Sequence, residues 1–182
     1  MNDKGLKFRF KVTVIGDGMV GKTSLIKKFT QGSFRNEYIK TIGAQFSVYN
    51  AEINGDKIRL LFWDIAGQDD FNFLRPSFYR DAAAAIIVYT LEENSLGSSS
   101  FNNIARWHED LKQFCTNIPV VVFANKVDLV SENELDESII QEIVKQRDFL
   151  GYFKTSAKTG QGVIEAFNAI IDELYRKFKA LS

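Results

Sequence analysis

Hydrophobic and polar residues follow two different periods along this chain. Segments with a period of two, and unbroken apolar runs of similar length, predict strands. These segments cover residues 8–14, 45–53, 57–63, 82–89, 119–124 and 152–154. Asn54 and Gly55, between the second and third segments, are typical of a two-residue hairpin turn.

Between the strands, apolar residues three and four positions apart predict helices that bury one face. The stripes are Leu25, Ile26 and Phe29; Ile104, Trp107, Leu111 and Phe114; Ile139, Ile140, Ile143 and Val144; and Val163, Phe167, Ile170, Ile171, Leu174 and Phe178. We expect the last stripe to close the core rather than lie on a membrane. Residues 31–40 and 66–80 have no clear period and predict loops. The alternation of strands and helices favours an α/β fold with a mostly parallel sheet.

Residues 16–23, GDGMVGKT, fit the pattern G-x-x-x-x-G-K-[ST] between a predicted strand and a predicted helix. Backbone N–H groups at such a junction point to one spot, where the helix dipole also favours a phosphate. We expect Lys22 to reach the β- and γ-phosphates and the Thr23 hydroxyl to bind Mg²⁺. A glycine turn without a ligand is the alternative, and the complete pattern favours nucleotide binding over it.

A second motif, Asp64-Ile-Ala-Gly67, follows the predicted strand 57–63 directly. A carboxylate at a strand end beside a phosphate loop can hold Mg²⁺ or a water bound to it. The Gly67 N–H could donate to the last phosphate, and the Gln68 amide suits the orientation of an attacking water. The alternative is an aspartate that only caps a turn, which the phosphate loop makes less attractive.

Two further motifs follow the strands 119–124 and 152–154, and they indicate guanine. The Asp128 carboxylate can accept both N1–H and N2–H of guanine, a pair that adenine does not offer. Lys126, next to Asn125, can lay its methylenes over the base. Residues 156–158, Ser-Ala-Lys, could donate a backbone N–H to guanine O6. Carboxyl strand ends are where ligands bind in such sheets.

Composition narrows the classes of protein. The length of 182 residues suits one domain, residues 1–182, and 23 basic against 23 acidic residues argue against a nucleic-acid binder. The only cysteine, Cys115, excludes an internal disulfide, and we expect it buried in a helix. The only histidine, His108, is expected on an exposed helix turn without a role. No apolar run approaches the roughly 20 residues of a membrane span.

Taken in order, GDGMVGKT, Thr41, DIAGQ, NKVD and SAK resemble the motif set of the Ras superfamily of small GTPases. Residues 41–46, TIGAQF, residues 61–64, LFWD, and residues 78–81, FYRD, resemble the Rab branch most. The resemblance implies the three-layer P-loop NTPase fold. That fold has a mostly parallel six-stranded sheet with one antiparallel edge strand, and five helices.

The resemblance also implies roles for individual residues. Those implied to bind nucleotide are Asp17, Gly18, Met19, Val20, Gly21, Lys22, Thr23, Ser24, Phe34, Tyr38, Thr41, Gly67, Asn125, Lys126, Asp128, Leu129, Ser156, Ala157 and Lys158. Hydrolysis would rest on Gln68, Lys22 and Thr41. Thr23, Thr41 and, through a water, Asp64 would bind Mg²⁺. Residues 31–42 and 66–80 would be the two switch segments.

The implied function is a switch between GDP-bound and GTP-bound states that hydrolyses GTP slowly and regulates membrane traffic or related effector recruitment. Its partners would be an exchange factor, a GTPase-activating protein and effectors. Phe46, Trp63 and Phe78 match aromatic residues that cluster beside the switches in Rab proteins and help to read out the GTP state. We expect a cytoplasmic monomer that partners recruit to membranes, because residues 177–182 offer no cysteine for stable membrane anchoring.

Two other functions are alternatives to a GTPase switch, and the sequence differs from the family's motifs at two places. A binding module that does not hydrolyse GTP is disfavoured by Gln68 and Thr41, and a P-loop kinase would need an acceptor site and a lid that no segment supplies. Met19 stands where the family carries Gly or Ala, and Asp69-Asp70 replaces a Glu-Arg pair. Both departures bear on recognition by the usual Rab activators and exchange factors.

Overall fold

In the computed structural model, residues 5–33, 43–67, 73, 75–131 and 135–181 are described. Six strands form one sheet in the order β2-β3-β1-β4-β5-β6. They are β1 (Leu6–Ile15), β2 (Ala44–Ile53), β3 (Asp56–Ile65), β4 (Ala84–Thr90), β5 (Val120–Asn125) and β6 (Gly151–Thr155). Only β2 runs antiparallel, and it pairs with β3 at one edge of the sheet. The predicted sheet is confirmed.

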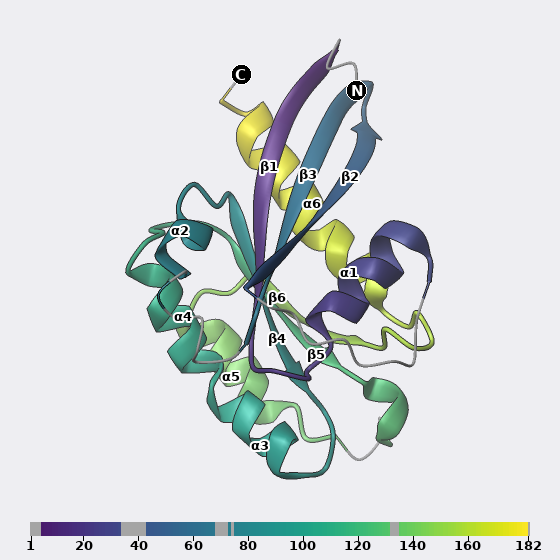
Figure 1. The fold of residues 1–182 in the computed structure, drawn as a ribbon, viewed down its shortest axis with the longest axis vertical. Coiled ribbons are helices and arrows are strands. Elements are labelled where there is room, and N and C mark those ends of the chain that lie inside the picture. The colour runs from purple at the N-terminus through teal and green to yellow at the C-terminus, as the bar shows by residue number, and fades with distance from the viewer. Residues whose placement is uncertain (1–4, 34–42, 68–72, 74, 132–134, 182) are drawn as a thin grey trace.

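Helices cover both faces of this sheet. They are α1 (Lys22–Gln31), α2 (Arg75–Tyr79), α3 (Ser95–Asn102), α4 (Ile104–Lys112), α5 (Ser138–Gln146) and α6 (Val163–Lys179), with a short 3-10 turn at Val127–Leu129. In Figure 1, α1 and α6 lie on one side of the sheet and α2 to α5 on the other. Counting α3 and α4 as one helix interrupted at Asn103, the described residues contain the five helices that the resemblance implied.

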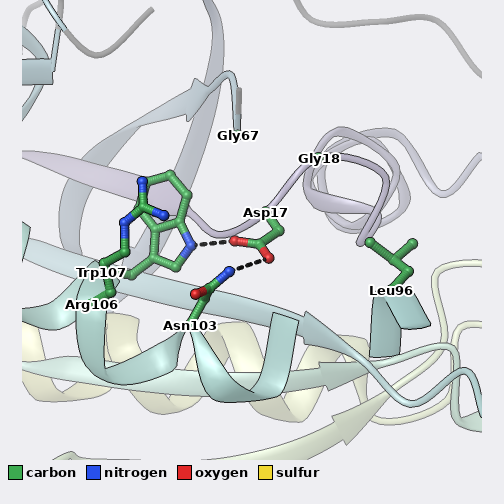
Figure 2. A pocket seen from close by; sticks show the side chains of 7 residues that line it. All are labelled: Asp17, Gly18, Gly67, Leu96, Asn103, Arg106 and Trp107. Carbon is green, nitrogen blue, oxygen red and sulfur yellow. Dashed lines mark hydrogen bonds between the residues drawn. The ribbon is translucent and has the colours of Figure 1, made fainter. Parts of the chain in front are cut away.

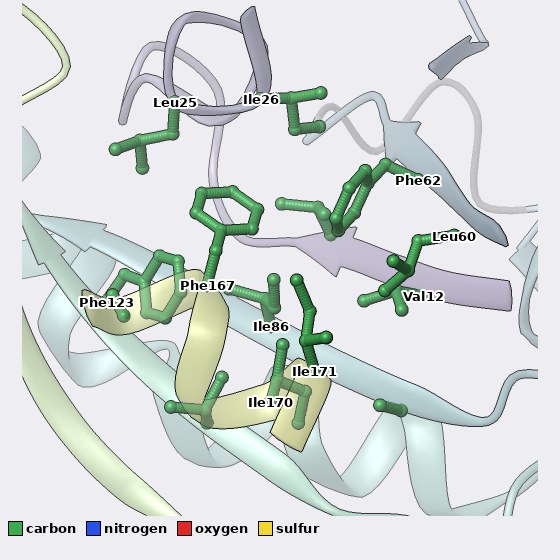
Figure 3. Close-up of a cluster of buried hydrophobic side chains, with 14 of the residues drawn as sticks. Val12, Leu25, Ile26, Leu60, Phe62, Ile86, Phe123, Phe167, Ile170 and Ile171 are labelled. Atoms are coloured by element: carbon green, nitrogen blue, oxygen red, sulfur yellow. The ribbon is translucent and has the colours of Figure 1, made fainter. Parts of the chain in front are cut away.

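The core lies in two layers because alternate residues of the central strands face opposite sides. Ile86 and Val88 of β4 join the layer under α1 and α6, whereas Ala85 and Ile87 join the layer under α4 and α5. Phe167 of α6 stacks on Phe29 at 4.3 Å between ring centroids and meets Phe123 of β5 edge to face. Figure 3 shows Phe167 pointing from α6 into this layer. The last helix therefore closes the core, as predicted.

The hairpin prediction is also confirmed. Asn54 and Gly55 have φ of 51° and 81°. Both residues have the left-handed backbone conformation that a type I′ turn requires. Ile53 and Asp56, on either side of the turn, pair with each other. The turn fixes the register in which β2 pairs with β3.

Four details of the predicted helices and loops are wrong. His108 is not exposed, because α4 turns it against Phe149, 4.7 Å away between ring centroids, and leaves it 8% exposed. Cys115 is buried as expected, but α4 ends at Lys112, so Cys115 lies beyond the helix. Phe114 also follows the helix and is 43% exposed. Residues 75–79, within a predicted loop, form the short helix α2.

No helix in the described ranges is long and apolar enough to cross a membrane.

Candidate functional site

The motifs found in the sequence meet at one edge of the sheet. The strands β1, β3, β5 and β6 are parallel and end at Ile15, Ile65, Asn125 and Thr155, so the motifs that follow them share the carboxyl edge. The Asn125 side chain connects two of these motifs directly. Its Nδ2 donates to the carbonyl oxygen of Val20 at 2.9 Å, and its Oδ1 accepts from the Ala157 N–H at 3.2 Å.

The loop of residues 16–23 needs small residues where it approaches its neighbours. A Cβ on Gly21, whose φ is 99°, would lie 2.3 Å from Asn125 Nδ2. A Cβ on Gly67 would lie 2.3 Å from the carbonyl carbon of Asp17, so the end of the second motif packs directly on the phosphate loop. Met19 has a φ of 66° and is 57% exposed. Its bulk therefore lies on the outer side of the loop.

Lys22 is the first residue of α1 and its side chain is buried. Its Nζ donates to the carbonyl oxygens of Gly16 at 2.8 Å and Asp17 at 2.7 Å. The pKa of Lys22 is lowered to about 8, mainly by burial; the carboxylates of Asp64 and Asp17 oppose this shift, and Arg75 adds a smaller lowering effect that is included in this value. A buried ammonium beside a loop of backbone N–H groups suits a polyphosphate.

Two oxygen groups that Mg²⁺ prefers meet at the start of α1. The Thr23 hydroxyl donates to Asp64 Oδ2. No cluster of three His, Cys, Asp or Glu residues exists within the described ranges. Mg²⁺ usually keeps several waters and is bound by one or two protein oxygens plus substrate phosphates, so this pair of side chains fits the ion.

The base end of the site is a small network around Asp128. Its Oδ1 accepts from the Ser156 hydroxyl at 2.6 Å, and Lys158 Nζ lies 3.9 Å from its Oδ2. The Ser156 hydroxyl in turn accepts from the Thr159 N–H at 3.0 Å. Lys126, in left-handed backbone conformation, pairs with Glu92 at 2.5 Å. The Asp128 carboxylate is thus oriented by Ser156 and Lys158, which lie on the loop after β6, and Lys126 is two residues away from it in the chain.

The structure places most of the predicted site residues, and four lie outside the described residues: Phe34, Tyr38, Thr41 and Gln68. Ser24 follows Thr23 in the first turn of α1. Leu129 ends the 3-10 turn after Asp128 and is exposed. Gly18 lines a pocket of about 220 Å³ next to Gly67.

Sequence reasoning missed the polar partners of Asp17. Trp107 Nε1 donates to Asp17 Oδ1 at 2.7 Å, and Asn103 Nδ2 donates to Asp17 Oδ2 at 2.8 Å. Figure 2 shows the side chains of Asn103, at the junction of α3 and α4, and of Trp107 in α4 pointing at this carboxylate across the pocket, with Arg106 and Leu96 at its sides. The sequence did contain one indication of this contact: Asn103 and Trp107 are four residues apart, a spacing that puts two side chains on the same face of a helix. Glu92, the partner of Lys126, was also missed.

The three aromatic residues that match the Rab cluster, Phe46, Trp63 and Phe78, lie together in the structure. The rings of Phe46 and Trp63 meet edge to face at 4.4 Å between centroids, and Trp63 lies 5.8 Å from Phe78. Lys11 Nζ lies 3.8 Å from the centre of the Trp63 ring. Phe46 is 60% exposed, so the cluster presents an apolar surface near the end of β3.

Comparison with known proteins agrees with this geometry. Residues 11–176 match the model of the Ras family. The chain is 36% identical over 170 residues to Ras-related protein Rab-30 of Homo sapiens, covering 92% of this chain and 80% of that protein. It is 34% identical over 169 residues to Ras-related protein Rab-13 of Mesocricetus auratus (92% and 81%). It is 33% identical over 170 residues to GTP-binding protein ypt3 of Schizosaccharomyces pombe (93% and 77%).

Proposed function

This chain belongs to the Ras family, and from that premise we propose that it is a GTPase switch that binds GDP and GTP with Mg²⁺ and hydrolyses GTP slowly. One observation supports the proposal most. The Asn125 side chain joins the phosphate loop at Val20 to the base-recognition loop at Ala157. A ligand with phosphates at one end and a base at the other would span the two loops that this side chain connects.

Guanine is the base that the site suits. Asp128 would accept N1–H and N2–H, and the Ser156 hydroxyl at 2.6 Å holds its carboxylate in one orientation. Lys126 would cover the base with its methylenes while its ammonium stays with Glu92. We assign base recognition to Asn125, Lys126, Asp128 and the loop of residues 156–158.

Hydrolysis would depend on positioning more than on covalent chemistry. A water attacks the γ-phosphorus, the bond to the β–γ bridging oxygen breaks, and that oxygen leaves with the electron pair as part of GDP. The oxygen and protons of the water stay with the inorganic phosphate, which releases one proton to solvent. Lys22 would stabilise charge on the β- and γ-phosphates, and the Gly67 N–H would face the γ-phosphate. Gln68, from the sequence pattern, would orient the water. Thr23, Thr41 and, through a water, Asp64 would hold Mg²⁺, which supplies further charge neutralisation when bound.

A single-turnover assay tests the hydrolytic part of the proposal. Gln68→Leu should lose most GTP turnover and keep GDP affinity near the parent value, because it removes the water's orientation and no phosphate contact. Gln113→Leu, an exposed glutamine after α4, is the matched control and should behave like the parent. Equal turnover in Gln68→Leu and the parent would refute the role of Gln68. No turnover in the parent would instead favour a GTP-binding module without hydrolysis.

We further propose that the switch acts as a monomer in membrane traffic or related effector recruitment, served by an exchange factor, a GTPase-activating protein and effectors. The relatives named above support this class of role, and the cluster of exposed Phe46 with half-buried Trp63 and Phe78 is the surface that would read the GTP state. Aromatic anchors of this kind dominate interface energies.

Phe46→Ala should weaken GTP-selective partner binding by about 1 kcal/mol or more, with GDP affinity unchanged. The measurement is a pull-down with protein loaded with GDP or with a non-hydrolysable GTP analogue, followed by titration of a captured partner. Phe114→Ala, an exposed aromatic after α4, is the control. Identical partner sets in both nucleotide states would mean that this surface does not read the nucleotide.

A further inference from the structure

The Asp17 carboxylate is bonded through one oxygen to α4 and through the other to Asn103, the residue just before α4, and this segment carries none of the nucleotide motifs. Trp107 Nε1–H donates to Oδ1 at 2.7 Å and Asn103 Nδ2 donates to Oδ2 at 2.8 Å. Hydrogen bonds to a charged acceptor are short and stronger than neutral ones. Asp17 is therefore anchored at a fixed place between Gly16 and Gly18 in the phosphate loop.

We infer that Asn103 and Trp107 are positioning residues for the phosphate loop, which act through Asp17 and set how fast bound nucleotide is released. The inference rests on the proposed nucleotide-binding function. It assigns a role to one residue of α4 and to the residue that precedes this helix, neither of which the sequence motifs contain.

The path from α4 to the phosphates runs through a single residue. The carbonyl oxygen of the same Asp17 accepts from Lys22 Nζ at 2.7 Å, so its side chain and main chain tie α4 to the buried lysine. A shift of the Asp17 side chain would move that carbonyl and the Gly18 N–H that follows it. Both lie where small misplacements are costly for binding.

The indole ring is itself held in place. The Arg75 guanidinium lies 4.3 Å from the centre of the Trp107 ring, and its Nη1 donates to Asp110 Oδ2 at 3.3 Å. The Tyr79 hydroxyl donates to the same oxygen at 2.9 Å. Asp110 is on α4, and Arg75 and Tyr79 are on α2. The ring is thus fixed by α2 with its N–H aimed at the phosphate loop.

An exchange of the two polar partners tests the inference. Asn103→Asp places a second carboxylate against Asp17, and we expect release of a fluorescent GDP analogue, chased with excess GDP, to become about tenfold faster or more. Adding Asp17→Asn restores one donor and one acceptor with their places reversed, so release should return towards the parent rate. A parent-like rate in Asn103→Asp, or no recovery in the double variant, would overturn the inference.

Trp107→Phe provides a second, independent variant. It keeps an aromatic ring under Arg75 but removes the N–H donor, and we expect release to be about tenfold faster. His108→Asn is the control. His108 is buried next to Trp107 on the same helix, but its ring packs on Phe149 and not on the phosphate loop. The substitution should lower the melting temperature and leave the release rate unchanged. Faster release in both variants would mean general loosening of α4 and would overturn the inference.

Failure of the inference and failure of the proposed function give different results. Without a guanine-nucleotide site, the parent protein would not retain the GDP analogue at all. With such a site but no role for α4, the parent would retain it and the Asn103 and Trp107 variants would release it at the parent rate.

Discussion

At the phosphate end of the site, Lys22 is buried and donates to two backbone carbonyl groups. At the base end, Lys158 is exposed and its ammonium lies 3.9 Å from Asp128. The phosphate end is built into the protein's interior, whereas the base end is a network of side chains on two loops. The Lys158 side of this ion pair is exposed, and such pairs contribute little to stability, so an uncharged side chain that keeps the hydrogen bond from Ser156 should cost the fold little.

This difference separates two kinds of effect. Changes at the base end should alter which base is bound, while changes at the phosphate end should alter the binding of every nucleotide. Asn125 belongs to both ends, because it bonds Val20 on one side and Ala157 on the other. The predictions below use these three cases to test the distinction.

The largest effect is expected at the base end. Asp128→Asn should change the preference for guanine over xanthine nucleotides by roughly 10⁴-fold, since an amide can donate to the C2 carbonyl of xanthine. Competition of GDP and xanthosine diphosphate against a fluorescent GDP measures this. Asp172→Asn, on the exposed face of α6, is the matched control. An unchanged preference would show that Asp128 does not read the base.

At the phosphate end, Lys22→Ala should weaken the binding of GDP and of xanthosine diphosphate alike, by about 100-fold or more. The substitution removes the buried ammonium that would pair with the phosphates of either nucleotide. Titration calorimetry with both nucleotides measures the two affinities. Lys27→Ala, later on the same helix and half-buried, should bind both normally. If Lys22→Ala discriminated between the bases, the separation of the two ends would be wrong.

The residue shared by both ends should affect binding and folding together. Asn125→Ala leaves the Val20 carbonyl and the Ala157 N–H buried without this partner, so unfolding free energy should fall by about 2 to 4 kcal/mol. Urea unfolding of the nucleotide-free protein measures it. Asn102→Ala, exposed at the end of α3, is the control. A loss of affinity without any loss of stability would contradict the bridging role.

A smaller effect comes from the pKa of Lys22, which burial lowers to about 8 from an ordinary 10.5. Below pH 8 the buried Lys22 is charged in the folded, nucleotide-free protein, and this lowers the free energy of unfolding. Between pH 8 and pH 10.5 the folded protein loses this proton while the unfolded chain keeps it, so the free energy of unfolding should rise with pH. Phosphates favour the charged lysine, so GDP binding should take up a proton and weaken by at most about tenfold from pH 8 to pH 9. Calorimetry in buffers of different ionisation enthalpy measures the uptake. Lys22→Ala should lose this part of the pH dependence.

The sequence was sufficient for features that depend on local pattern. The strand periods, the Asn54-Gly55 turn and the apolar stripe of α6 reflect interactions between neighbouring residues, and the parallel order of strands brings Lys22 and Asp128 to one edge. A parallel sheet places all carboxyl strand ends together, so motifs at those ends converge whatever the packing details.

The sequence was insufficient where one helix meets a distant segment. The spacing of Trp107 predicted an apolar face, but not that its N–H would meet Asp17, 90 residues earlier. His108 was placed on the wrong side because the approach of Phe149 to α4 has no signature in the local pattern. Both outcomes depend on how α4 is rotated on the sheet, which many distant side chains determine together.

The most direct test of the guanine-nucleotide site is displacement of a fluorescent GDP from the purified protein in the presence of Mg²⁺. The account predicts that unlabelled GDP and GTP displace the probe near stoichiometric concentrations, while ADP and ATP fail to do so at about 1,000-fold excess. Displacement by ADP at the same concentrations as GDP would contradict it.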